Sequence, residues 1–166
     1  MTKYELLTAR PVGKMDAHQT GIPPLGVSVF IFCGDELLIQ RRAASKYHSA
    51  LQWSNTCCTY PNIGEDEQSA ADRRVVEELG FSVSLQPANL IAYSTQAANG
   101  LAEQGRVRIF KGFADKESLW LDFDPEEIDA VRWAKPEALR NEIYRRPQDF
   151  TPWFRVYIER WAELGL

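Results

Sequence analysis

Short runs of apolar residues alternate with turn residues along most of the chain. Residues 27–32 (Val-Ser-Val-Phe-Ile-Phe) are mainly β-branched or aromatic, which predicts a buried strand. Residues 33–35 (Cys-Gly-Asp) predict a turn, and residues 36–41 are the expected hairpin partner. Further strands are predicted at 54–58, 82–85, 90–93, 107–113 and 130–133, with a loop at 61–64 and a turn at 97–100.

Helical spacing of apolar residues appears in three places. The clearest is 67–79, where Gly80 follows as a stop signal. A short helix is predicted over 135–141, opened by Pro136. The last is an amphipathic helix over 153–164, and proline is favourable at a helix start such as Pro152. Mixed strands around a central helix predict an α/β sandwich with a mixed sheet.

Composition narrows the possible classes of protein. The chain has 166 residues, of which 45% are hydrophobic and 25% charged, so one globular domain over 1–166 is expected. The net charge of −4 argues against a nucleic-acid binder. No apolar run approaches the roughly 18 residues of a membrane span. Three cysteines do not form a disulfide framework, which favours a reducing cytoplasm. We expect a monomer or a weak dimer.

The segment 64–81 combines a helix with conspicuous charge. Arg74 and Glu78 lie four residues apart and therefore project from one helix face. Such a pair can bind a phosphate and a divalent metal on that phosphate, although an ordinary surface ion pair is the alternative. The segment resembles a Nudix box at Glu65, Arg73, Glu77, Glu78 and Gly80.

Two positions depart from that box. Arg74 stands where Nudix hydrolases have a glutamate, and Thr59 replaces the first glycine. The missing carboxylate removes a ligand for a hard metal ion. Hydrolysis of a diphosphate is therefore not expected.

A wider pattern is more specific. Residues 40–48 (Gln-Arg-Arg-Ala-Ala-Ser-Lys-Tyr-His), 53–58 (Trp-Ser-Asn-Thr-Cys-Cys) and 73–80 together resemble type 1 isopentenyl-diphosphate isomerase, a branch of the Nudix superfold. The resemblance runs from Lys14 to Trp153. It implies a Nudix-type α/β/α sandwich and an enzyme of isoprenoid biosynthesis.

The resemblance also implies residue roles. The family converts a five-carbon homoallylic diphosphate to the allylic isomer, using a cysteine and a metal-bound glutamate on opposite faces of the substrate. The matching positions are Cys58, Tyr93 and Trp153 for catalysis; Lys14, Arg42, Lys46 and Arg74 for the diphosphate; and Glu78 for magnesium on that diphosphate.

Elementary chemistry agrees with these roles. Converging cations supply the charge-assisted hydrogen bonds that phosphates need. Aromatic faces stabilise a carbocation by roughly 2 kcal/mol or more when water is excluded. Taken alone, Cys58 would be read as a small buried hydrophobe, and Trp153 equally well as a core residue. Their joint spacing favours function.

The chain departs from the family at its second metal site, which uses three histidines and two glutamates. Only His18 and Glu103 match that ligand set. Pro24, Tyr60 and Gly105 occupy the other three positions and offer no comparable ligand atoms. We therefore expect the zinc site to be lost. We also expect Gly105 to open space in a more apolar cavity that admits a longer prenyl chain.

Several functions remain open from these residues. The leading hypothesis is protonation-initiated chemistry on a prenyl diphosphate, either double-bond isomerisation or cyclisation with the diphosphate retained, with Cys58, Tyr60 or Glu103 as proton donor. The alternatives are isopentenyl-diphosphate isomerisation in a remodelled site and non-catalytic binding of a prenyl diphosphate. The acidic segment 122–127 is interpreted as a solvated loop.

Overall fold

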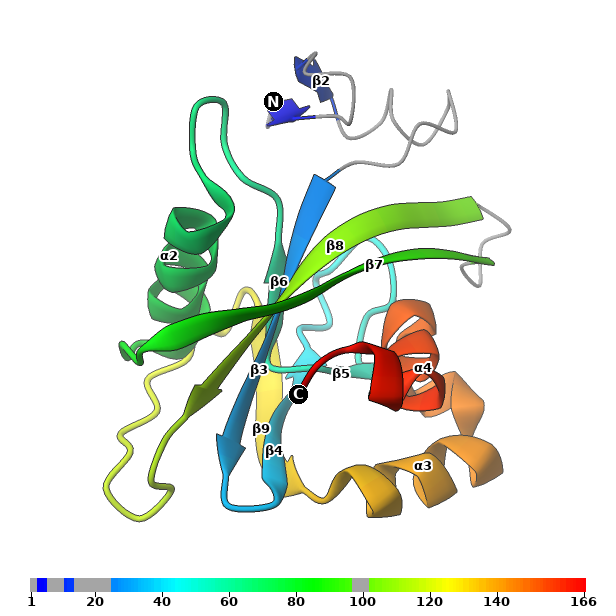
Figure 1. The fold of residues 1–166 in the computed structure, drawn as a ribbon. Helices are drawn as coiled ribbons and strands as arrows, with labels where there is room; N and C mark the ends of the chain where they lie inside the picture. Colours follow the sequence, from blue (N-terminus) through cyan, green and yellow to red (C-terminus); the bar gives the residue numbers. More distant parts are fainter. Residues whose placement is uncertain (1–2, 6–10, 14–24, 97–101) are drawn as a thin grey trace.

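The computed structural model describes residues 3–5, 11–13, 25–96 and 102–166, and for 3–5, 11–13, 96 and 102–104 it describes the backbone alone. A seven-stranded mixed sheet forms its centre (Figure 1). The sheet consists of β3 (Leu25–Cys33), β4 (Glu36–Arg42), β5 (Trp53–Ser54), β6 (Cys57–Thr59), β7 (Leu85–Gln96), β8 (Ala102–Phe113) and β9 (Ile128–Ala134). A separate antiparallel pair joins β1 (Lys3–Glu5) and β2 (Pro11–Gly13).

Strand pairing explains why the sheet is mixed. The strand order is β5-β4-β3-β8-β7, with β6 paired to β3 and β9 paired to β4. β3 and β8 run parallel from Leu25–Arg106 to Phe32–Phe113, whereas β7 and β8 are antiparallel. β3 and β4 form the predicted hairpin, in which Gly34 adopts a φ of 59° that suits glycine.

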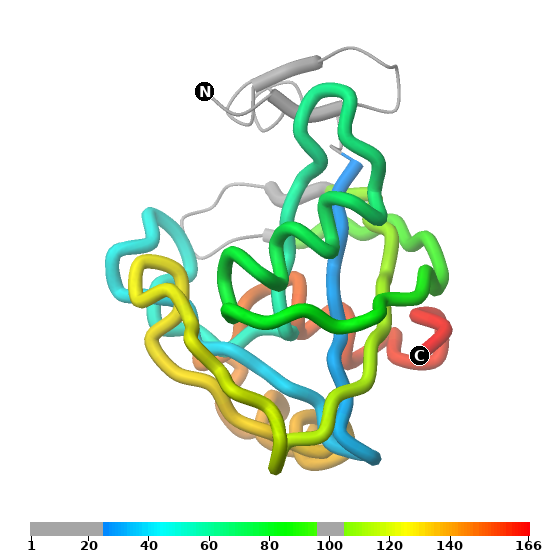
Figure 2. Tube along the Cα trace, turned by 90° about the vertical axis from the view of Figure 1, so that its left-hand side faces the viewer, coloured from blue at the N-terminus to red at the C-terminus, as the bar shows by residue number. Residues whose placement is uncertain are grey.

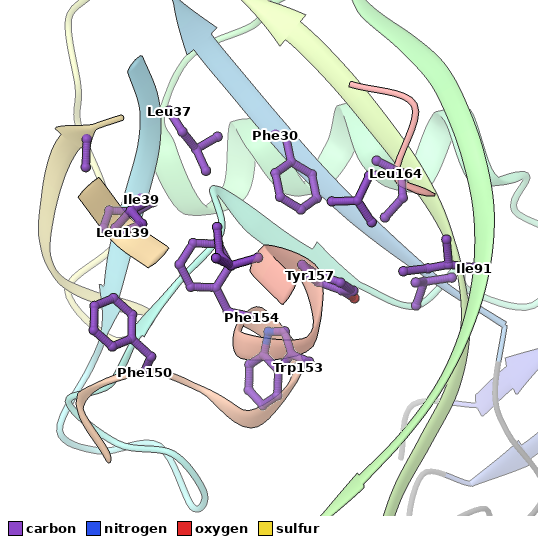
Figure 3. Close-up of a cluster of buried hydrophobic side chains, with 14 of the residues drawn as sticks. Phe30, Leu37, Ile39, Ile91, Leu139, Phe150, Trp153, Phe154, Tyr157 and Leu164 are labelled. Atoms are coloured by element: carbon purple, nitrogen blue, oxygen red, sulfur yellow. The ribbon is translucent and has the colours of Figure 1, made fainter. Parts of the chain in front are cut away.

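Helices lie on both faces of the sheet, as Figures 1 and 2 show. α2 (Glu67–Leu79) packs on one face through Ala70, Ala71, Val75 and Leu79. α3 (Pro136–Arg145) and α4 (Pro152–Glu159) contribute to the core on the other face, where Leu139, Phe154 and Tyr157 are buried (Figure 3). The predicted α/β/α sandwich is therefore confirmed.

The ends of α2 follow from its capping residues. The Asp66 side chain accepts a hydrogen bond from the backbone N–H of Ser69 at 2.8 Å, which caps the start. Gly80 ends the helix with a φ of 77°, and a Cβ there would lie 2.5 Å from the carbonyl oxygen of Asp122. The sequence prediction of this helix and of its stop is confirmed.

The predicted strand at 54–58 is wrong in its middle. Asn55 and Thr56 separate β5 from β6, and both side chains are buried and bonded to backbone groups. Asn55 Nδ2 donates to the carbonyl oxygens of Val29 and Cys57, and Thr56 Oγ1 donates to that of Leu38. Side-chain hydrogen bonds thus replace part of the sheet ladder here.

Other predicted boundaries move as well. β7 runs continuously from residue 85 to 96, with an irregularity between Pro87 and Leu90, so the strands predicted at 82–85 and 90–93 are one strand and residues 82–84 lie outside it. β8, β9 and α3 are longer than predicted. The last helix ends at Glu159 and a 3₁₀ turn follows at Trp161–Glu163. The turn predicted at 97–100 lies outside the described residues. Within the described residues, no helix is both long and apolar enough to cross a membrane.

Candidate active site

Most of the predicted site residues line one cavity of about 810 Å³. It lies among β3, β6, α2, α4 and the loop after β4. The predicted residues that line it are Arg42, Lys46, Cys58, Tyr60, Arg74, Glu78, Tyr93 and Trp153. Lys14, His18 and Pro24 lie outside the described residues, and of Glu103 only the backbone in β8 is described.

The basic side of the cavity contains paired charges. Arg74 lies 2.5 Å from Glu78 through Nε and 2.9 Å from Glu127 through Nη2. Lys46 Nζ lies 2.7 Å from the same Glu127 oxygen. Burial opposes the charge of Arg74, but the Glu78 and Glu127 carboxylates outweigh it and raise the pKa of Arg74 above its usual value. The interpretation of 122–127 as a wholly solvated loop is therefore wrong for Glu127.

The Arg74–Glu78 pair is not an ordinary surface pair. The two side chains share one helix face as predicted, but the Glu78 side chain is only 5% exposed. Gln40 Nε2 donates to its second carboxylate oxygen at 2.6 Å. Burial raises the pKa of Glu78, whereas Arg74 and Gln40 oppose that rise. The stability of a buried carboxylate depends strongly on such partners.

Arg42 offers an unused donor. Its Nε is buried and has no hydrogen-bond acceptor among the described residues. Its Nη2 donates to the carbonyl oxygen of His48 at 3.3 Å, and its guanidinium lies 5.4 Å from the ring centroid of Trp153. Burial lowers the pKa of Arg42 below its usual value. Because a buried unpaired N–H is costly, this position favours an anionic oxygen.

Cys58 sits in a network that holds its thiol. The sulfur donates to Asn55 Oδ1 at 3.3 Å and lies 3.3 Å from Ser28 Oγ. The Asn55 amide cannot turn freely, because its Nδ2 donates to two backbone carbonyls. Burial raises the pKa of Cys58, so the thiol is protonated at neutral pH. A protonated thiol can donate a proton but cannot accept one at its sulfur.

Trp153 serves both the core and the cavity. Its side chain is part of the buried cluster beside Phe154 and Tyr157 (Figure 3) and also lines the cavity. Its Nε1 donates to Ser54 Oγ at 2.9 Å, and Ser54 Oγ in turn donates to Asn55 Oδ1 at 3.1 Å. The indole and the thiol are therefore positioned by one connected set of hydrogen bonds.

The expectation that Gly105 opens space is wrong. Tyr93 and Gly105 are directly opposite in the β7–β8 register. A Cβ at position 105 would lie 2.9 Å from Cε1 of Tyr93 and 3.1 Å from its hydroxyl oxygen. The phenol ring of Tyr93 occupies the place that a side chain at 105 would need.

A substitution at Gly105 tests this contact. In a free strand position, alanine for glycine is favourable by roughly 0.5–1 kcal/mol. Here Gly105→Ala is expected to lower the free energy of unfolding by about 1–3 kcal/mol, because the new methyl group collides with the ring. In a Tyr93→Ala background the same change should be neutral or favourable. Urea unfolding of the four proteins measures both costs, and equal losses in the two backgrounds would contradict the contact.

Several residues that line the cavity carry no clear signal in the sequence. Glu127 lies in an acidic loop with no motif, and Gln40 and Asn55 belong to the family motifs at 40–48 and 53–58 without an implied role. Ser28 is a lone polar residue in an apolar strand, which was the only sequence signal for its buried hydroxyl. Tyr157 on α4 gave no signal beyond amphipathic spacing.

The donor set fits a magnesium ion that arrives with a diphosphate. Mg²⁺ is usually held by one or two carboxylates together with substrate phosphates. Glu78 and Glu127 both line the cavity and share Arg74 as a partner. In the part of the chain with described side chains, no three His, Cys, Asp or Glu residues are placed to hold a metal by themselves. Because His18, Pro24 and the Glu103 side chain are not described, the lost zinc site stays a prediction.

Comparison with known proteins first defines the class. A NUDIX domain is matched over residues 22–154. Among solved structures, DR0079 from Deinococcus radiodurans has a TM-score of 0.73 at 19% identity, over 95% of this chain and 98% of that one. A MutT NUDIX hydrolase from Burkholderia pseudomallei has a TM-score of 0.63 at 22% identity, over 82% and 96%. The fold is that of a Nudix protein.

Closer relatives define the family. Isopentenyl-diphosphate Delta-isomerase of Rhodobacter capsulatus is 40% identical over 156 residues, which cover 93% of this chain and 88% of the relative. The protein of the same name from Dinoroseobacter shibae is 43% identical over the same length and coverage. The chain belongs to the isopentenyl-diphosphate Delta-isomerase family, a family of enzymes. The resemblance seen in the sequence is thereby confirmed.

Proposed function

We propose that this protein binds a prenyl diphosphate in the cavity and interconverts isopentenyl diphosphate and dimethylallyl diphosphate. The names of its relatives favour this reaction over the cyclisation that the sequence analysis placed beside it. One observation carries the proposal: Cys58 lines the same cavity as Arg42, whose buried Nε has no acceptor in the part of the chain that the structure describes.

The diphosphate binds at the basic side of the cavity. Arg42 supplies the Nε donor that has no acceptor among the described residues, and Arg74 and Lys46 supply further charge. Glu78 and Glu127 are the residues that would hold magnesium on the phosphates, and that ion would offset part of the phosphate charge. When the diphosphate binds, Arg74 and Lys46 exchange their carboxylate partners for phosphate oxygens. The charges of the site are therefore balanced both with and without the substrate.

The hydrocarbon end lies toward Cys58, Tyr93 and Trp153. The protonated thiol of Cys58 donates to the terminal methylene carbon of isopentenyl diphosphate, which leaves a tertiary carbocation. The aromatic rings of Tyr93 and Trp153 stabilise that cation and exclude water from it. Loss of a proton from the carbon next to the cationic centre completes the isomerisation.

The direct test is product analysis with purified protein. Isopentenyl diphosphate and magnesium are incubated with the protein, and dimethylallyl diphosphate is measured by NMR. Conversion to an equilibrium mixture, approached from either isomer, is expected. No conversion from either side, with or without added magnesium or zinc, would reject the proposed reaction.

A longer prenyl diphosphate is the second candidate, followed by double-bond migration or cyclisation. The cavity volume favours it, because about 810 Å³ lies in the upper part of the roughly 300–1,000 Å³ range of sites for drug-sized ligands. The same assay with the ten-, fifteen- and twenty-carbon diphosphates decides between the two. Tight binding by calorimetry without any product would instead indicate a non-catalytic binding protein.

A further inference from the structure

A chain of hydrogen-bonding groups leads away from Cys58 through the protein interior. Cys58 Sγ lies 3.3 Å from Ser28 Oγ, and Ser28 Oγ lies 2.7 Å from the hydroxyl of Tyr157. Tyr157 also has a side-chain hydrogen bond with Tyr93. The two rings pack edge to face, with their centroids 5.9 Å apart. Four residues from β3, β6, β7 and α4 therefore form one continuous series.

The positions of the four residues suit proton transfer. Ser28 and Tyr157 are each 1% exposed, so water does not bypass the middle of the series. Cys58 and Tyr93 are the two ends, both half-buried, and both line the cavity. In each of the two bonds made by Ser28, either atom is able to donate. Hydroxyl and thiol groups with this freedom pass a proton along by exchanging donor and acceptor roles.

The glycine at position 105 lies beside Tyr93, the residue at the far end of the hydrogen-bonded series. The Tyr93 hydroxyl lies 3.1 Å from the point where a Cβ at position 105 would be. No carboxylate is available at that position, and the phenol stands in its place. The second half of the reaction still needs a group that accepts a proton from the substrate.

We infer that Ser28 and Tyr157 are relay residues that return a proton from Tyr93 to Cys58 in every turnover. The inference rests on the proposed function and specifies how an isomerase of this family works with glycine at position 105. Neither relay residue reacts with the substrate. Both act through Cys58 and Tyr93, the two residues that contact the substrate.

The proton balance closes within one turnover. The Cys58 S–H bond breaks as its proton joins the terminal carbon, which leaves a thiolate and a carbocation. Ser28 passes its proton to the thiolate, Tyr157 passes one to Ser28, and Tyr93 passes one to Tyr157. The Tyr93 phenolate then removes a proton from the carbon beside the cation, and the electron pair of that C–H bond forms the new double bond. All four groups return to their first state.

Deuterium exchange in D₂O separates a relay from a structural role. With Tyr157→Phe, Cys58 still delivers deuterium, but Tyr93 can no longer pass its proton along the series and stays protonated, so the cation returns a hydron to the Cys58 thiolate. Net isomerisation should fall about 100-fold, in the range for loss of an acid–base group. Uptake of deuterium into the terminal methylene of isopentenyl diphosphate, followed by NMR, should continue at the wild-type rate. A parallel loss of both rates would overturn the relay, as would unchanged isomerisation.

A folding check and two further variants control this experiment. Tyr157→Phe keeps the ring that meets Phe30 at 5.7 Å, and a thermal unfolding curve checks that the fold survives. Ser28→Ala interrupts the same series at another point and should reproduce the split between exchange and isomerisation. Tyr144→Phe is the matched control, since Tyr144 is 89% exposed on α3, and it should leave both rates unchanged.

A measurement without substrate separates failure of the relay from failure of the proposed function. The pKa of Cys58 is read from the pH dependence of its alkylation, with the modified residue located by mass spectrometry. Ser28→Ala removes a hydrogen bond that lowers this pKa and leaves the opposing charges of Glu78 and Arg42 in place, so the pKa should rise. An unchanged pKa means that the series does not exist. If the pKa rises but the wild type converts no isopentenyl diphosphate, the proposed function and its relay fail while the hydrogen-bonded series stands.

Discussion

Cys58→Ser is expected to lower the rate of isomerisation about 1,000-fold, within the range for loss of a general acid. A serine hydroxyl has nearly the size of the thiol but is a much weaker acid, so the transfer to carbon slows. The dissociation constant of the prenyl diphosphate should change by less than about threefold, because Arg42, Lys46 and Arg74 are untouched. Product formation by NMR and binding by calorimetry measure the two quantities on the same preparation.

Cys33→Ser is the matched control for that experiment. Cys33 lies at the end of β3 in the hairpin and does not line the cavity. It is half-exposed, so serine is tolerated there. Full activity of Cys33→Ser beside the loss in Cys58→Ser assigns the effect to one sulfur atom. Equal activity of both variants would remove Cys58 from the mechanism.

The sequence predicted correctly those helices and hairpins that are determined by residues close to one another in the chain. α2 matched because its apolar period, its Asp66 cap and its Gly80 stop all lie within a few turns of one another. The β3–β4 hairpin matched for the same reason, since Gly34 supplies the turn. Where the cause is tertiary, the prediction failed. The break at Asn55 and Thr56 comes from backbone groups of β3 and β4 that lie elsewhere in the sequence.

The candidate site divides in the same way. The structure brings Cys58, Arg74 and Trp153, which the family motif singled out, to one cavity, because a motif carries positional information from the whole fold. The motif said nothing of Tyr157, whose hydroxyl meets Ser28 because α4 packs against β3. The effect of Gly105 was misjudged because the ring that fills its space comes from the neighbouring strand. Composition and spacing cannot reveal a cross-strand neighbour until the register is known.

The largest expected effect on stability is that of Arg74→Met. The variant leaves the 5% exposed Glu78 carboxylate with Gln40 as its remaining partner. Removing one member of a buried ion pair costs about 3–5 kcal/mol, and we expect about 3 kcal/mol of lost unfolding free energy at pH 7. Glu127 contributes little to that loss, because it keeps its pair with Lys46. Urea unfolding at several pH values measures it.

The pH dependence distinguishes this cause from lost packing. The pKa of Glu78 is already raised by burial in the folded protein, and without Arg74 it rises further. A carboxyl group with a raised folded pKa gives its full stability below its unfolded pKa and loses it as the pH rises through the folded value. The deficit of Arg74→Met should therefore be largest at neutral pH and should shrink as the pH falls toward the usual glutamate value of 4.5. Lost packing would give a deficit that does not depend on pH.

Arg73→Met provides the comparison on the same helix. Arg73 pairs with Glu65 at 2.7 Å and with Glu77 at 3.0 Å, in a setting where its side chain is 28% exposed. The Arg73–Glu65 pair is partly buried and Glu77 is exposed, so we expect a loss of about 1 kcal/mol, well below that of Arg74→Met. Arg73 also lines the cavity, so the two variants are compared by their stability and not by their affinity for a prenyl diphosphate. Similar losses of stability in the two variants would contradict this explanation. They would mean that the loss comes from removing any positive charge from α2, and not from leaving the buried Glu78 carboxylate without its partner.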